Sequence, residues 1–103
     1  MNEVNPRPAA ALALVGWYLM VPPVIKTNSA EYSGYKADFD SPLSRWQVNS
    51  AFDSASACNS LSAALVFKGE RDMKKTHGLD WAIAQSLTQN QCIATDDPRL
   101  KEK

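Results

Sequence analysis

The chain has 103 residues, 45% of them hydrophobic, with 11 basic and 11 acidic side chains. This length predicts one domain. The charges are interspersed, without the basic stripe that binds nucleic acid, so no nucleic-acid partner is expected. A domain this small buries a modest share of its surface and often needs a covalent or metal staple.

An apolar run near the N-terminus bears on where the protein resides. Residues 9–21 are almost entirely apolar, and a Pro-Pro pair ends the run. The run is shorter than the about 20 residues of a membrane-spanning helix and has the length of a signal-peptide apolar region. Three interpretations stay open: a signal peptide cleaved between residues 13 and 16, an uncleaved membrane-proximal segment, and a cytosolic strand or helix. Under the first two, residues 1–16 are a targeting segment and residues 17–103 form one small domain.

Two strands are predicted on either side of a polar stretch. Aromatic and branched side chains favour a strand over Trp17–Val21. Residues 24–41 are mostly polar and rich in turn residues, which predicts a long connecting loop with at most a little local structure. The period-two placement of Trp46 and Val48 predicts a second strand over residues 44–50, antiparallel to the first and with both side chains on one face.

Residues 54–67 form the clearest predicted helix. Asp53 or Ser54 can cap its first turn by accepting from a free backbone amide. Apolar side chains recur at spacings of three and four, which places Cys58 on the apolar face. Gly69 is predicted to end the helix.

The C-terminal part predicts one more helix and one more strand. Residues 70–75 are charged and predict a solvent-exposed segment. A helix is expected over residues 79–90, where Leu79, Ile83 and Leu87 recur every four residues as its apolar face. Alternation predicts a short strand over residues 91–95. These elements predict an α+β fold, in which a two- to three-stranded antiparallel sheet packs against one or two helices.

Few residues suggest chemistry. His77 stands alone, without a second ligand type close by or a partner that would mark it as a catalytic base, which argues against a metal site or general base catalysis. Asp96 and Asp97 with Arg99 form the one concentrated polar group. A carboxylate pair can bind a divalent cation, but the favoured interpretation is a turn cap and an ion pair. We therefore predict no enzyme, with no catalytic, cofactor-binding or metal-binding residues and no cofactor.

The two cysteines, Cys58 and Cys92, fit two alternatives when taken by themselves. In the cytosol they would be small buried hydrophobic residues, whereas in an oxidising compartment they could form a disulfide. The choice depends on the N-terminal segment, and the residues alone leave it open.

Several features follow one another in a particular order along the chain. An aromatic strand at Trp17 precedes a segment containing Trp46, then a Phe-Asp-Ser helix start leading to Cys58, and finally Cys92 before the ending DDPRLK at 96–101. This order resembles a loose group of small exported bacterial proteins without a known activity. The resemblance implies export and a Cys58–Cys92 disulfide, and it carries over no functional residues.

The resulting functional expectation is a non-enzymatic module, periplasmic, secreted or associated with the cell envelope, that has a structural role or binds an unidentified protein partner. The alternative is a small accessory subunit of a membrane-associated complex. In that case, an uncleaved apolar segment within residues 9–21 would hold it to the membrane, facing the periplasm.

Overall fold

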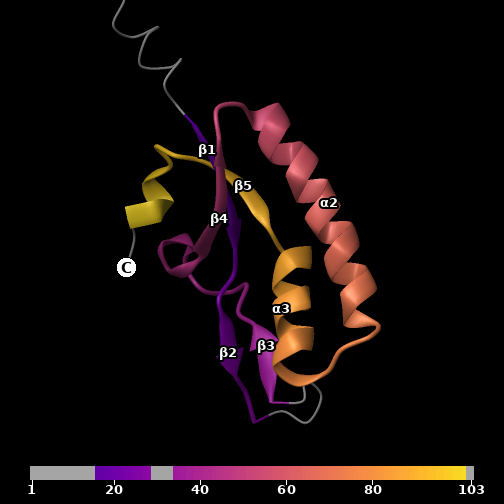
Figure 1. The fold of residues 1–103 in the computed structure, drawn as a ribbon. Coiled ribbons are helices and arrows are strands. Elements are labelled where there is room, and N and C mark those ends of the chain that lie inside the picture. The colour runs from indigo at the N-terminus through magenta and orange to yellow at the C-terminus, as the bar shows by residue number, and fades with distance from the viewer. Residues whose placement is uncertain (1–15, 29–33, 102–103) are drawn as a thin grey trace, which may run out of the picture.

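A computed structural model gives the fold and describes residues 16–28 and 34–101 (Figure 1). Five strands and two longer helices make up the described part, together with two short 3-10 turns, η2 and η3. In chain order they are β1 (Trp17–Val21), β2 (Val24–Lys26), β3 (Tyr35–Ala37), η2 (Leu43–Arg45), β4 (Gln47–Phe52), α2 (Ala55–Met73), α3 (Gly78–Thr88), β5 (Gln91–Ala94) and η3 (Pro98–Lys101). The predicted α+β fold is confirmed.

The main sheet has three antiparallel strands in the order β4-β1-β5, so the predicted first strand lies at its centre. Leu19 pairs with Ser50 and Met20 pairs with Val48, which leaves Asn49 as an extra residue in a β-bulge. The strand expected over 44–50 begins later, because Leu43–Arg45 forms η2. Val48 is also 51% exposed, so it does not share a buried face with Trp46.

β1 is buried on both faces of the sheet. On one face Leu19 packs in a cluster with Cys58 of α2. On the other face Met20 packs with Trp46 and Ile93. A strand covered on both sides has no polar face, which explains why its sequence is apolar without alternation.

A second sheet lies within the segment that was expected to be a loop. β2 and β3 form an antiparallel hairpin in which Val24 pairs with Ala37. Ala37 is fully buried, and its backbone N–H donates to Oε1 of Gln85 in α3 at 2.8 Å. Each strand has only three residues, too few for alternation to show. The prediction of a loop over residues 24–41 is therefore wrong for these two strands.

α2 begins at the predicted cap and ends later than expected. The Oγ of Ser54 accepts from the Ala57 N–H at 3.1 Å, which makes Ser54 the N-cap. The helix continues through Gly69 to Met73, so the prediction that Gly69 ends it is wrong. Gly69 is buried instead, and a Cβ added there would lie 2.6 Å from the carbonyl oxygen of Ala84 in α3.

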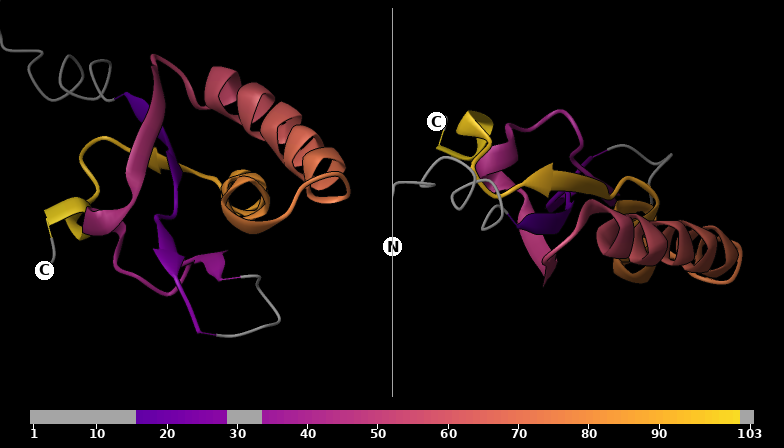
Figure 2. Two further views of the ribbon diagram at one scale, coloured as in Figure 1. Left: turned by 60° about the horizontal axis from the view of Figure 1, so that its bottom comes forward. Right: turned by 90° about the horizontal axis from the view of Figure 1, so that it is seen from above.

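α3 lies between α2 and the β2–β3 hairpin, as the left view of Figure 2 shows almost end-on. Polar contacts fix it on both sides. The Ser86 hydroxyl donates to the Pro22 carbonyl at 2.7 Å, and the Asn90 side-chain amide donates to the Ser62 carbonyl at 3.2 Å. Because the Ser86 bond is buried, it satisfies two polar groups that would otherwise destabilise the fold.

Candidate functional site

A disulfide joins Cys58 to Cys92, as the resemblance implied. It connects the first turn of α2 with β5, across a Cα–Cα distance of 6.1 Å. The Cys58 side chain is fully buried beside Leu19. Both cysteines of the chain are consumed in this bond. The bond is therefore a structural element that fixes helix to sheet, and no thiol is left for nucleophilic chemistry.

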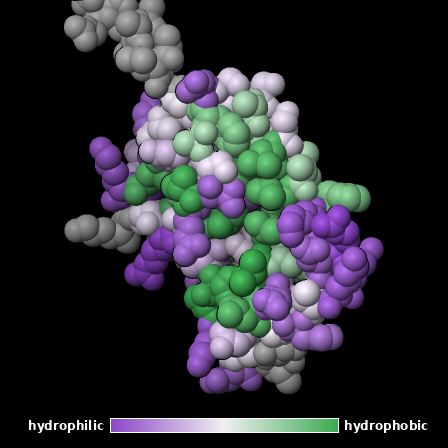
Figure 3. Space-filling view, viewed as in Figure 1, coloured by the Kyte–Doolittle hydropathy of each residue, from purple (hydrophilic) through white to green (hydrophobic). Residues whose placement is uncertain are grey.

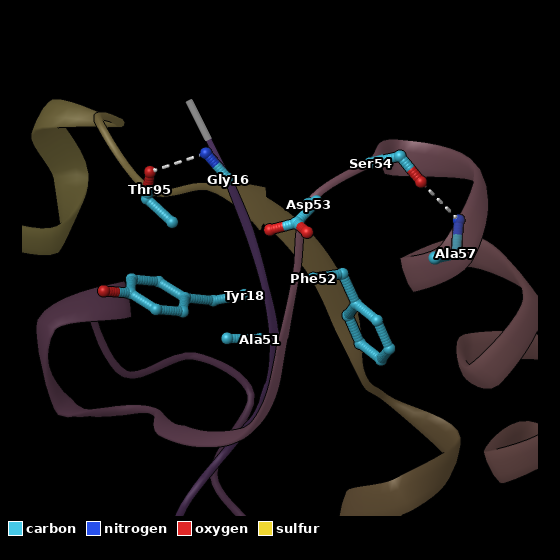
Figure 4. Close-up of a pocket in the computed structure, with 8 residues that line it drawn as sticks. All are labelled: Gly16, Tyr18, Ala51, Phe52, Asp53, Ser54, Ala57 and Thr95. Carbon is cyan, nitrogen blue, oxygen red and sulfur yellow. Dashed lines mark hydrogen bonds between the residues drawn. The ribbon is translucent and has the colours of Figure 1, made fainter. Parts of the chain in front are cut away.

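An open hollow of about 610 Å³ lies where β1, β4 and the start of α2 meet (Figure 4). The chain enters the described region at its rim, at Gly16. Its lining combines small, aromatic and hydroxyl side chains with one carboxylate, and consists of Gly16, Tyr18, Ala51, Phe52, Asp53, Ser54, Ala57 and Thr95.

The hydroxyl groups of this hollow serve the local backbone. Thr95 Oγ1 accepts from the Gly16 N–H at 3.1 Å, and Ser54 Oγ is the N-cap acceptor described above. Covalent catalysis by a hydroxyl requires a base within hydrogen-bond reach. The only histidine of the chain, His77, instead occupies the N-cap position of α3. Among the described residues that line the hollow, the Ser54 and Thr95 hydroxyls accept from backbone amides, and the Asp53 carboxylate is hydrogen-bonded to neither hydroxyl.

Asp97 and Arg99 form the pair that the sequence indicated. The Arg99 guanidinium donates to both carboxylate oxygens of Asp97, from Nη2 at 2.8 Å and from Nε at 3.1 Å. The Arg99 backbone N–H donates to the same carboxylate at 2.9 Å. These bonds from Arg99 hold the pKa of Asp97 below its ordinary value. This geometry stabilises the turn into η3 and leaves the carboxylate already occupied by a cation.

Within residues 16–28 and 34–101, no group of three or more His, Cys, Asp or Glu side chains is placed to hold a metal ion. Asp96 is exposed and follows the end of β5. It does not complete a ligand set with Asp97 and His77.

An exposed apolar stripe runs along α3 and consists of Leu79 and Ile83. These side chains are one helical turn apart and are 48% and 46% exposed. Figure 3 shows hydrophobic surface along the middle of the molecule, over β5 and α3. The sequence predicted both residues on the core-facing side of their helix, but only Leu87 reaches the cluster around Leu19. A spacing of four identifies an apolar stripe without telling how much of it the core covers.

Comparisons of the chain with protein-family models, curated proteins and solved structures give no match. A function can therefore be proposed only from the sequence and from the geometry described above.

Proposed function

We propose that this protein is a non-enzymatic module of the periplasm, the cell envelope or the extracellular space that binds or supports another protein. The observation that carries the proposal is the Cys58–Cys92 disulfide, whose Cys58 side is fully buried. Disulfides of this structural kind persist in oxidising compartments and are rare in the cytosol. The signal-peptide length of the apolar run in residues 9–21 supports the same location.

The stripe of Leu79 and Ile83 supports a binding role. Both side chains project from a helix that is held rigidly by the Ser86–Pro22 and Gln85–Ala37 hydrogen bonds. A rigid apolar surface can bind a partner at little cost in conformational entropy. The partner expected here presents an apolar surface of its own that covers this stripe.

Analysis of the protein from its native source tests the location. Mass spectrometry of the intact chain is expected to show a mature N-terminus within residues 14–17 and a mass two hydrogens below that of the dithiol, in the periplasmic or secreted fraction. A cytosolic protein that retains Met1 and carries two free thiols would contradict export.

Capture of partners from the same source tests binding. The double variant Leu79→Ser/Ile83→Ser should lose co-purifying protein that the native chain retains. Val48→Ser is the matched control, because Val48 is a similarly exposed aliphatic side chain on β4, 51% exposed. Equal recovery of partners by all three proteins would contradict a binding role for α3.

The second candidate is an accessory subunit held at a membrane. It is favoured by the apolar residues that directly precede Gly16. β1 takes up Trp17–Val21, so the part of the apolar run left for an anchor is residues 9–16. Among the residues that the structure describes, no helix is both long and apolar enough to cross a bilayer. Retention in membranes after alkaline extraction, with residues 1–16 intact, would favour this candidate over a cleaved, exported chain.

A further inference from the structure

The last turns of α2 place an aromatic side chain beside a group of cations. Phe67 is 69% exposed, the most exposed of the large hydrophobic side chains in the described part of the chain. Arg71 and Lys74 follow it at spacings of four and seven, so all three share one face of the helix. A hollow of about 250 Å³ is lined by Phe67, Glu70, Arg71, Lys74 and Lys75.

The charge of this region is unbalanced, although that of the whole chain is balanced. Residues 68–75 carry four cations and two carboxylates. Lys68 Nζ lies 2.6 Å from Asp72 and Arg71 Nε lies 3.5 Å from the same carboxylate, so two cations share one anion. Lys74 and Lys75 are both exposed. Figure 3 shows the hydrophilic side chains gathered at this end of α2, with hydrophobic surface beside them.

We propose that this end of α2, defined by Phe67, Arg71, Lys74 and Lys75, docks on a membrane surface that contains anionic phospholipid. A cation close to such a surface strengthens binding by roughly fivefold. An exposed aromatic side chain among the cations can enter the boundary between headgroups and acyl chains.

The exposure of Phe67 favours a lipid surface over an acidic peptide. Groove-binding modes of peptide recognition enclose the anchoring side chains, whereas Phe67 at this hollow is 69% exposed. A projecting aromatic side chain surrounded by cations is complementary to a flat, negatively charged interface. This contact is separate from the α3 stripe, and it goes beyond the proposed function because it does not depend on export or on a protein partner.

Vesicle co-sedimentation of the oxidised full-length chain tests the proposal. The vesicles contain phosphatidylcholine alone or phosphatidylcholine mixed with phosphatidylglycerol. The native chain should prefer the mixed vesicles, and Lys74→Gln/Lys75→Gln should reduce the binding constant for them by roughly 25-fold. The control is Lys26→Gln/Lys101→Gln, which removes the same charge from two exposed lysines on other elements and should bind as the native chain does.

A second pair of variants tests the aromatic contact. Phe67→Ser should weaken binding to the mixed vesicles by roughly tenfold. Phe39→Ser is its control, because Phe39 is 48% exposed outside α2 and should contribute nothing. All variants carry the same N-terminal segment, so any lipid affinity of that segment is a common background.

Three results would overturn the proposal. The first is equal binding of the Lys74/Lys75 variant and its control. The second is binding to phosphatidylcholine vesicles as strong as to the mixed vesicles, at low and at high salt. The third is binding to polyglutamate without binding to mixed vesicles, which would assign the surface to an acidic peptide. Circular dichroism of each variant checks that the fold is intact. The native chain alone also tests the proposal, because its binding to the mixed vesicles should weaken as salt is added.

Discussion

Reduction of the Cys58–Cys92 bond should destabilise this domain more than any single change at its surface. The bond closes a loop across a sequence separation of 34. In the chain-entropy model, releasing such a loop lowers the free energy of unfolding by about 4 kcal/mol. For a domain of this size each kcal/mol corresponds to about 4–8 °C in Tm, so reduction should lower Tm by roughly 15–30 °C.

Comparing reduction with substitution separates two contributions to this loss of stability: the loop constraint and the packing of the buried sulfur. Reduction leaves both sulfur atoms in place, so Cys58 can still fill its site beside Leu19. The variant Cys58→Ala/Cys92→Ala loses the loop constraint and also the buried sulfur of Cys58, which leaves a cavity. The variant should therefore melt below the reduced native protein, and its Tm should not respond to reductant.

Thermal unfolding followed by circular dichroism, with and without a phosphine reductant, measures both effects. Thiol titration in denaturant establishes that the bond is broken in the reduced sample. A reduced protein with two titratable thiols and an unchanged Tm would refute the reasoning. It would mean that sheet and helix packing alone hold α2 against β5.

Three further predictions concern the helix contacts and the C-terminal turn. Gly69→Ala should lower the free energy of unfolding in urea by about 1–3 kcal/mol, because its Cβ would overlap the Ala84 carbonyl, which outweighs the gain in helix propensity. Ser54→Ala should cost about 1 kcal/mol in the same assay through loss of the N-cap, with an unchanged pH dependence. Arg99 lowers the pKa of Asp97 in the folded protein, so this pair stabilises the fold above pH about 4, and its contribution is lost as the pH falls through the lowered pKa. Asp97→Asn should therefore flatten the stability profile below pH about 4, and an unaltered profile would contradict the pairing.

Local signals in the sequence were enough to predict the main sheet and both helices. The Pro-Pro pair limits β1, and the Ser54 cap with its apolar spacing defines the start of α2. These signals act within a few residues of the elements they specify. The β2–β3 hairpin lacks such a signal, because its strands are three residues long and one of them is fixed by Gln85, which lies far along the chain. The hairpin is held by contacts with α3, and the sequence near the hairpin carries no sign of these contacts.

The errors at Gly69 and at the α3 stripe both concern how α3 packs. A glycine near the end of an apolar pattern predicts a helix stop, but here its missing side chain lets α3 approach α2 at Ala84 and Thr88. Leu79 and Ile83 lie half exposed in the first two turns of α3, whereas Ser86, three residues after Ile83 on the same face, is buried and bonded to Pro22. The candidate binding surface is carried by the helix whose position against α2 depends on the close contact at Gly69. A substitution that separates the two helices there should alter partner binding as well as stability, even though Gly69 is buried and cannot contact a partner directly.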